Sequence, residues 1–167
     1  QGYADDDDRK SGPYHDSNSD GSIDFKSEFN VGWAVTAAKR DVCSACDTNY
    51  DFTKTIFDAY LEGRTLITNQ ADISAILAQR DVVMNNWEKV VAAVSVHYVN
   101  DTVEEIARLI DAGDASLSPG TSATADYEKY WGEMRGYANG LIYNDFKLID
   151  DASLARILQV MGTNPVY

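Results

Sequence analysis

Apolar residues recur every three or four positions along most of the chain, a spacing that places them on one face of an α-helix. A strand-like alternation of apolar and polar residues competes with this pattern nowhere in the sequence. The pattern predicts an all-α fold, an antiparallel helical bundle of about five to six helices. The helical segments cover residues 25–40, 51–67, 72–112, 123–143 and 152–161.

Local signals mark several ends of these segments. Asp51 is placed to cap the second helix. Gly113 and Gly162 are placed to end the third and the last, because glycine is the residue that most readily closes a helix. Residues 113–122 are rich in Gly, Ser and Pro, so we expect them to form a connecting loop.

The third segment is the longest, because it contains neither glycine nor proline. We nevertheless expect it to break near Asn100 and Asp101. Asp101 or Thr102 would then cap a shorter helix over residues 103–110.

The first 22 residues differ in composition from the rest of the chain. Asp, Ser, Gly and Asn predominate there, and almost no side chain could anchor a core. We therefore expect an acidic arm and loop over residues 1–22 and one helical domain over residues 23–167, a length that suits a single core.

Charge narrows the choice of partners. The 167 residues include 27 acidic and 14 basic side chains, which gives a net charge of −13. Such a chain repels phosphate backbones and anionic lipid head groups, so we expect no nucleic-acid partner, and cations are better candidates. No apolar run approaches the roughly 18 to 20 residues that a membrane helix needs, so no membrane span is expected.

Residues 16–28, which read D-S-N-S-D-G-S-I-D-F-K-S-E, carry a metal-binding pattern. Oxygen-bearing side chains alternate, a glycine stands sixth and an apolar residue eighth, as in the first two thirds of an EF-hand-type loop. Closely spaced carboxylates repel one another unless a hard cation such as Ca²⁺ neutralises them. The predicted Ca²⁺ ligands are Asp16, Asn18, Asp20, the Ser22 carbonyl, Asp24 and Glu28.

This loop departs from the EF-hand pattern in two ways. Ser27 stands at the twelfth position with Glu28 one residue late, and no helix is expected before the loop. The alternative is a metal-free polar turn that caps the following helix. If Ca²⁺ binds, we expect its role to be structural, because it would fix the arm to the start of that helix.

Cys43 and Cys46 are the only cysteines in the chain. We expect a local disulfide between them in an oxidising compartment, and a reduced pair is the alternative. Haem attachment would require a histidine in place of Asp47. Structural zinc would require further ligands, and only His15 and His97 are available.

No catalytic constellation can be assembled from the sequence. His97 lies in an apolar run, and we expect a hydrogen-bonded core residue there, because neither a nucleophile nor a second base can be paired with it. Tyr130, Trp131 and Tyr137 are expected to belong to the core or to an interface. We therefore expect a protein that is not an enzyme.

Four stretches of the chain carry a family resemblance: FNVGWAVTAAKRD from residue 29, YLEGRTLI from residue 60, WEKVVAA from residue 87 with His97 and Tyr98, and YWGEMRGY from residue 130 with residues 141–144. They resemble the C-terminal portion of an uncharacterised bacterial envelope family, domain of unknown function four-eight-five-six, which is loosely imelysin-like. Members of that family often have a histidine where Tyr130 stands. Imelysin-like proteins carry a Gly-x-His-x-x-Glu motif and are labelled as peptidases. This motif is absent here, so the resemblance implies no activity.

The resemblance implies a helical fold, a periplasmic, outer-surface or secreted location, and a missing N-terminal half. We accordingly expect a partner, either an N-terminal chain or segment of the same precursor or a further copy of this chain in a homo-oligomer. The favoured function is a non-enzymatic, calcium-stabilised structural or binding protein of the bacterial envelope or secreted fraction. The alternative is an imelysin-like component of metal or iron uptake.

Overall fold

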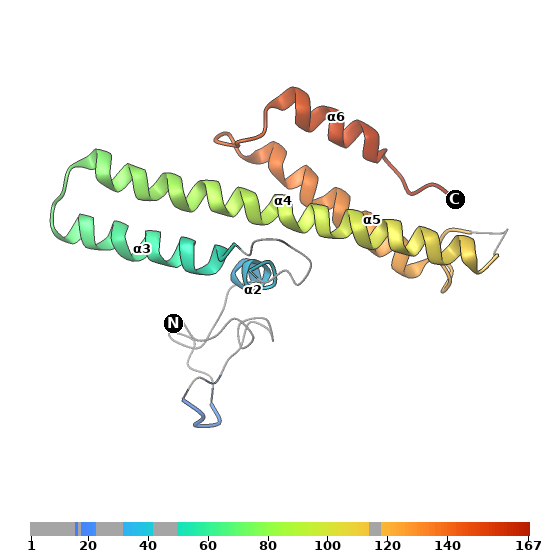
Figure 1. The fold of residues 1–167 in the computed structure, drawn as a ribbon, viewed down its shortest axis with the longest axis horizontal. Coiled ribbons are helices and arrows are strands. Elements are labelled where there is room, and N and C mark those ends of the chain that lie inside the picture. The colour runs from blue at the N-terminus through green and yellow to red at the C-terminus, as the bar shows by residue number, and fades with distance from the viewer. Residues whose placement is uncertain (1–15, 17, 23–31, 42–49, 114–117) are drawn as a thin grey trace. The chain divides into compact units, whose positions relative to one another are not determined.

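A computed structural model describes residues 16, 18–22, 32–41, 50–113 and 118–167. These residues form five α-helices and one 3₁₀ helix, and none of them belongs to a strand (Figure 1). The predicted all-α class is therefore confirmed. The chain divides into two compact units, residues 1–90 and residues 91–167, and each is described by itself.

The described part of the first unit contains α2 (Gly32–Ala38), α3 (Phe52–Thr68) and the beginning of α4 (Ile73–Asp111). The helix predicted over residues 25–40 is found as α2, while residues 23–31 lie outside the described part. Helix α3 begins after the predicted cap, because the Asp51 side chain accepts a hydrogen bond from the Lys54 N–H at 2.6 Å.

A tight reversal joins α3 to α4. The Ala71 N–H donates to the Leu66 carbonyl at 2.9 Å and the Gln70 N–H donates to the Ile67 carbonyl at 3.1 Å. Gln70 takes the left-handed conformation, with φ +52°, at the position where glycine is usual. The reversal makes α4 antiparallel to α3 (Figure 1).

Apolar side chains of all three helices form the core of this unit. Its buried members are Val35, Ala37, Ala38, Phe52, Ile56, Ala59, Val83 and Val90. Tyr50 adds a polar link, because its ring packs 4.8 Å from the ring of Phe52 and its hydroxyl donates to Asn86 Oδ1 at 2.8 Å. The start of α3 is thereby tied to α4.

Helix α4 runs unbroken for 39 residues, so the predicted break near Asn100 and Asp101 is wrong. The polar side chains that were expected to cap a new helix are satisfied inside the existing one. The Thr102 hydroxyl donates to the Tyr98 carbonyl at 2.6 Å, and Asp101 Oδ2 lies 3.3 Å from His97 Nε2. The helix ends as predicted at Gly113, which has φ +66°.

The second unit contains the remainder of α4, then α5 (Ala125–Gly140), the 3₁₀ helix η1 (Leu141–Tyr143) and α6 (Asp151–Met161). The helix predicted over residues 123–143 therefore finishes in a tighter turn. Helix α6 ends at Gly162 as predicted, with φ +76°. Asp150 caps its start, because the Asp150 side chain accepts from the Ser153 N–H at 2.8 Å.

Tyrosine rings join α4 to α5 in this unit. The Tyr98 ring stacks on Tyr130 and Tyr137, with centroids 6.1 and 5.9 Å apart. The Ser95 hydroxyl donates to the Met134 carbonyl at 3.3 Å. Tyr130 and Tyr137 therefore lie at the contact between α4 and α5, and they are half-buried, as Trp131 is.

Helix α5 also presents three exposed glycines, Gly132, Gly136 and Gly140, and a Cβ added at any of them would meet nothing within 4 Å. We expect Gly136→Ala to raise the free energy of unfolding by about 0.5–1 kcal/mol, because alanine loses less backbone entropy in a helix. Urea unfolding measures the change. Gly162→Ala should instead destabilise the chain, because φ is +76° there. A loss of stability in Gly136→Ala would contradict the open environment of this face.

Candidate functional site

The acidic loop closes around the carboxylate of Asp16. Asp16 Oδ2 accepts from the Gly21 N–H at 2.8 Å, and Asp16 Oδ1 accepts from the Asp20 N–H at 3.1 Å. Gly21 has φ +82°, in the left-handed region that favours glycine. The first and sixth positions of the predicted metal loop are thus joined directly.

The other two described side chains of the pattern turn toward the same loop backbone. Asn18 Oδ1 accepts from the Asp20 N–H at 3.0 Å, and Asp20 Oδ1 accepts from the Ser22 N–H at 2.8 Å. Asn18 Nδ2 also donates to Asp20 Oδ2 at 2.9 Å. Each carboxylate oxygen has two lone pairs, so both carboxylates keep acceptor capacity for a cation.

The structure therefore brings together the three side chains predicted at alternate positions, Asp16, Asn18 and Asp20. Ser22 follows them as an exposed residue at the end of the described loop. The remaining predicted ligands, Asp24 and Glu28, and the predicted disulfide of Cys43 and Cys46 lie outside the described residues, so they stay predictions.

Among the residues with described positions, no three His, Cys, Asp or Glu side chains are grouped so that they could hold a metal ion. Two of the described loop residues, Asp16 and Asp20, belong to these types, whereas Asn18 and Ser22 would contribute an amide oxygen and a main-chain carbonyl oxygen. None of the described helices is long and apolar enough to cross a membrane.

Asp41 is a buried carboxylate that the sequence analysis did not single out. It is 3% exposed and accepts hydrogen bonds from the Thr53 N–H at 3.1 Å and from the Thr53 hydroxyl. Burial raises the pKa of Asp41 above its ordinary value of 3.8. A carboxyl group with a perturbed pKa can mark an active site. Here both carboxylate oxygens accept hydrogen bonds from Thr53 at the start of α3, so the role of Asp41 is structural.

His97 was expected in the core, and that expectation is wrong. Its side chain is 41% exposed, and Nε2 lies near Asp101 on the same helix. The face of α4 that packs in the second unit carries Val94, Tyr98 and Leu109, and His97 lies beside it.

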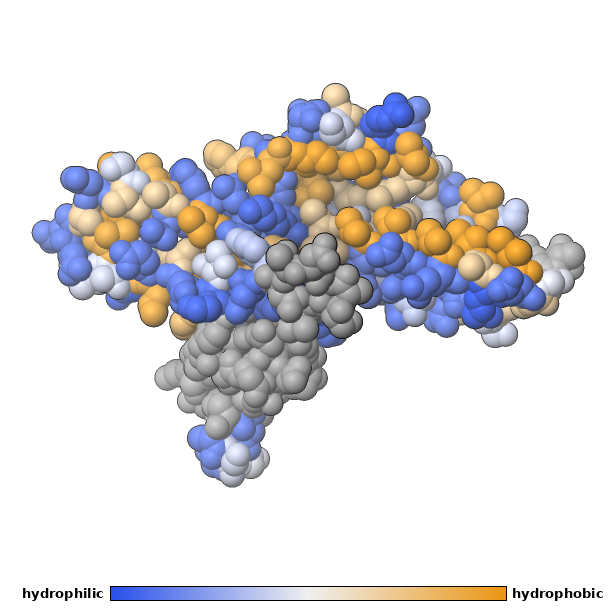
Figure 2. Space-filling model, viewed as in Figure 1, coloured by the Kyte–Doolittle hydropathy of each residue, from blue (hydrophilic) through white to orange (hydrophobic). Residues whose placement is uncertain are grey.

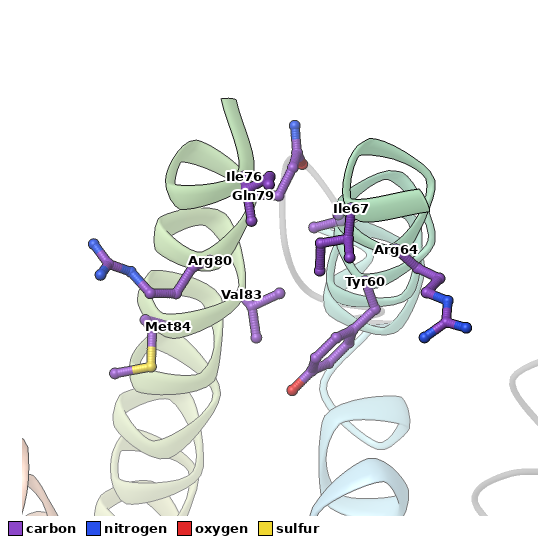
Figure 3. A pocket seen from close by; sticks show the side chains of 10 residues that line it. Tyr60, Arg64, Ile67, Ile76, Gln79, Arg80, Val83 and Met84 are labelled. Atoms are coloured by element: carbon purple, nitrogen blue, oxygen red, sulfur yellow. The ribbon is translucent and has the colours of Figure 1, made fainter. Parts of the chain in front are cut away.

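A second candidate is an apolar groove between α3 and the first part of α4, with a volume of about 370 Å³ (Figure 3). Tyr60, Ile67, Ile76, Val83 and Met84 are among the residues that line it. Arg64 and Arg80 stand on its two walls, and their guanidinium groups point away from each other on the outer sides of the helices. Since the two charges point outward, the groove supplies mainly apolar surface, and the Tyr60 hydroxyl is a polar group that points into it.

Comparisons with protein families, with curated proteins and with solved structures give no match to this chain. The resemblance to the envelope family, and the iron-uptake alternative that comes with it, therefore stay predictions.

Proposed function

We propose that this chain is a non-enzymatic structural or binding protein stabilised by Ca²⁺ in the loop of residues 16–28. The observation that carries the proposal is the hydrogen bond from the Gly21 N–H to Asp16 Oδ2 at 2.8 Å. In an EF-hand-type loop the sixth residue makes the sharp turn that lets the first, third and fifth residues face one ion. Asp16, Asn18 and Asp20 occupy these three positions.

Ca²⁺ prefers six to eight oxygen ligands. Three side chains and the Ser22 carbonyl supply the first part of that set, Asp24 and Glu28 would add to it, and water would complete it. The ion would also relieve repulsion between carboxylates in a chain whose net charge is −13. Calcium therefore suits this donor set better than a soft transition metal does.

The expected affinity supports a location outside the cytoplasm. EF-hand loops owe much of their affinity to a bidentate Glu at the twelfth position, where this loop has Ser27. We therefore expect a dissociation constant of about 10⁻⁴ to 10⁻³ M, the range of extracellular calcium modules. Such a site fills only where Ca²⁺ is plentiful, as in the periplasm, at the cell surface or in the secreted fraction.

Thermal unfolding with and without Ca²⁺ tests this function. At a Ca²⁺ concentration about tenfold above the dissociation constant, we expect about 1.4 kcal/mol of stabilisation. This corresponds to a rise in Tm of roughly 3–6 °C relative to the chelator-treated protein.

Asp20→Ala should abolish the rise, because it removes the fifth-position ligand. Asp145→Ala, which removes an exposed carboxylate outside the loop, should preserve it. Equal midpoints for the wild-type chain in calcium and in chelator would contradict the proposal and favour a metal-free turn.

A further inference from the structure

The part of α4 within the second unit has two apolar faces. One packs in the unit and carries the buried Val94 and Leu109. The other carries the set that we name the α4 stripe: Ala92, Val96, Val99, Val103, Ile106 and Ile110. Figure 2 shows an apolar band along this part of α4. The exposed fractions are 61% for Val96, 59% for Val103, 40% for Ile106 and 70% for Ile110.

The spacing of the α4 stripe indicates what covers it. Its members follow one another at intervals of four, three, four, three and four residues, which is the a and d pattern of a coiled coil. Residues in that pattern pack against a second helix, and every member then lies at the interface between the two helices. Five of the six side chains are β-branched, so little rotamer freedom is lost when they pack.

The stripe is complementary to itself when two copies run antiparallel. If a two-fold axis passes near residue 101, Ala92 meets Ile110, Val96 meets Ile106 and Val99 meets Val103 of the other copy. Each member then has an apolar counterpart, and the smallest side chain lies opposite a large one. An isologous contact of this kind closes after two copies.

The charges near the α4 stripe also allow a second copy to bind there, although each chain has a net charge of −13. The positions that flank the stripe on its open side are Ala93, Asn100 and Ala107, and all three are uncharged. On the other side Ser95 and Thr102 bond to main-chain carbonyls of α5 and α4. Two copies can therefore meet along the stripe without bringing like charges together at the seam.

We propose that two copies of this chain associate through the α4 stripe as an antiparallel helix pair. This interaction surface does not depend on calcium, and its test is separate from that of the acidic loop. The proposed contact explains why α4 carries Val and Ile on a face that its own unit leaves open, because exposed apolar patches of this kind mark interaction sites.

Sedimentation velocity of the full chain over a range of concentrations tests the association. We expect the wild-type chain to form a dimer and Val103→Asp to weaken it at least about 100-fold, because each dimer would then bury two carboxylates. Val160→Asp is the matched control, since Val160 is 78% exposed on α6 and lies outside the stripe. Circular dichroism checks that both variants keep their helices. A wild-type chain that stays monomeric at every concentration overturns the proposal. The α4 stripe would then pack against a helix of another protein.

Disulfide trapping tests the antiparallel register. In a chain carrying Cys43→Ser and Cys46→Ser, we introduce either Val96→Cys or Ile106→Cys. In the proposed pair each new thiol lies about 15 Å along the helix from its counterpart, because ten residues separate positions 96 and 106, so neither variant alone should cross-link. A mixture of the two should give a covalent dimer under mild oxidation. Efficient cross-linking of each variant with itself would indicate parallel helices and overturn the antiparallel arrangement.

Discussion

Leu154→Ala is expected to loosen α6 and to lower the free energy of unfolding by about 2–5 kcal/mol. Leu154 is 3% exposed, and within α6 no other side chain is buried. The substitution removes apolar contacts and leaves a cavity at the one buried side chain of α6. Hydrogen bonds from Arg135 to the carbonyls of Leu158 and Gly162 hold the other end of α6, and they cannot replace the lost contact.

Urea unfolding measures the change, and hydrogen exchange locates it. We expect the amides of α6 to lose protection first, because the lost contact belongs to that helix. Val160→Ala is the matched control, since the same kind of truncation on the same helix removes a side chain that is 78% exposed. Equal losses of stability in the two variants would show that Leu154 does not hold α6 in place.

Asp41→Ala is expected to cost about 2–3 kcal/mol of unfolding free energy. It leaves the N–H and the hydroxyl of Thr53 without their acceptor, and a donor left unsatisfied in a buried place costs about 1–3 kcal/mol. Asp58→Ala is the control, because the Asp58 side chain is 55% exposed and pairs with Lys54 at the surface. An Asp41→Ala loss no larger than that of Asp58→Ala would contradict the structural role of Asp41.

The cost of Asp41→Ala should depend on pH. Burial raises the pKa of Asp41 in the folded chain above its ordinary value of 3.8, so the folded state holds the proton more tightly than the unfolded state does. The stability that Asp41 supplies is therefore greatest below pH 3.8 and falls as the pH rises through the folded-state pKa. Unfolding of the wild-type and Asp41→Ala chains across this acidic range measures the difference.

The helices were predictable because their signals are local. Apolar periodicity located α3 and α6, and Asp51 and Gly162 marked a start and an end that the structure confirms. The turn of the acidic loop also rests on a local signal, since Asp16 and Gly21, which a hydrogen bond joins, are only five residues apart.

Other features were missed, the first because a local signal is ambiguous and the others because they depend on tertiary packing. The polar run at residues 100–102 resembles a helix start, but Thr102 bonds back to Tyr98, and α4 continues. The acceptor role of Asp41, which follows α2, depends on Thr53, twelve residues away in α3. Periodicity also cannot tell which apolar stripe of a long helix its own unit will bury, so the sequence did not distinguish the packed face of α4 from the α4 stripe.

Calorimetric titration of the chelator-treated chain with Ca²⁺ tests the central claim most directly, because it counts bound ions whether or not they change the thermal midpoint. We expect one saturable site per chain in the wild-type protein, and no saturable heat in Asp20→Ala or in a titration of the wild-type protein with a monovalent cation. No saturable heat from the wild-type protein at millimolar Ca²⁺, or equal binding by the Asp20→Ala variant, would contradict the assignment of residues 16–28 as a calcium loop.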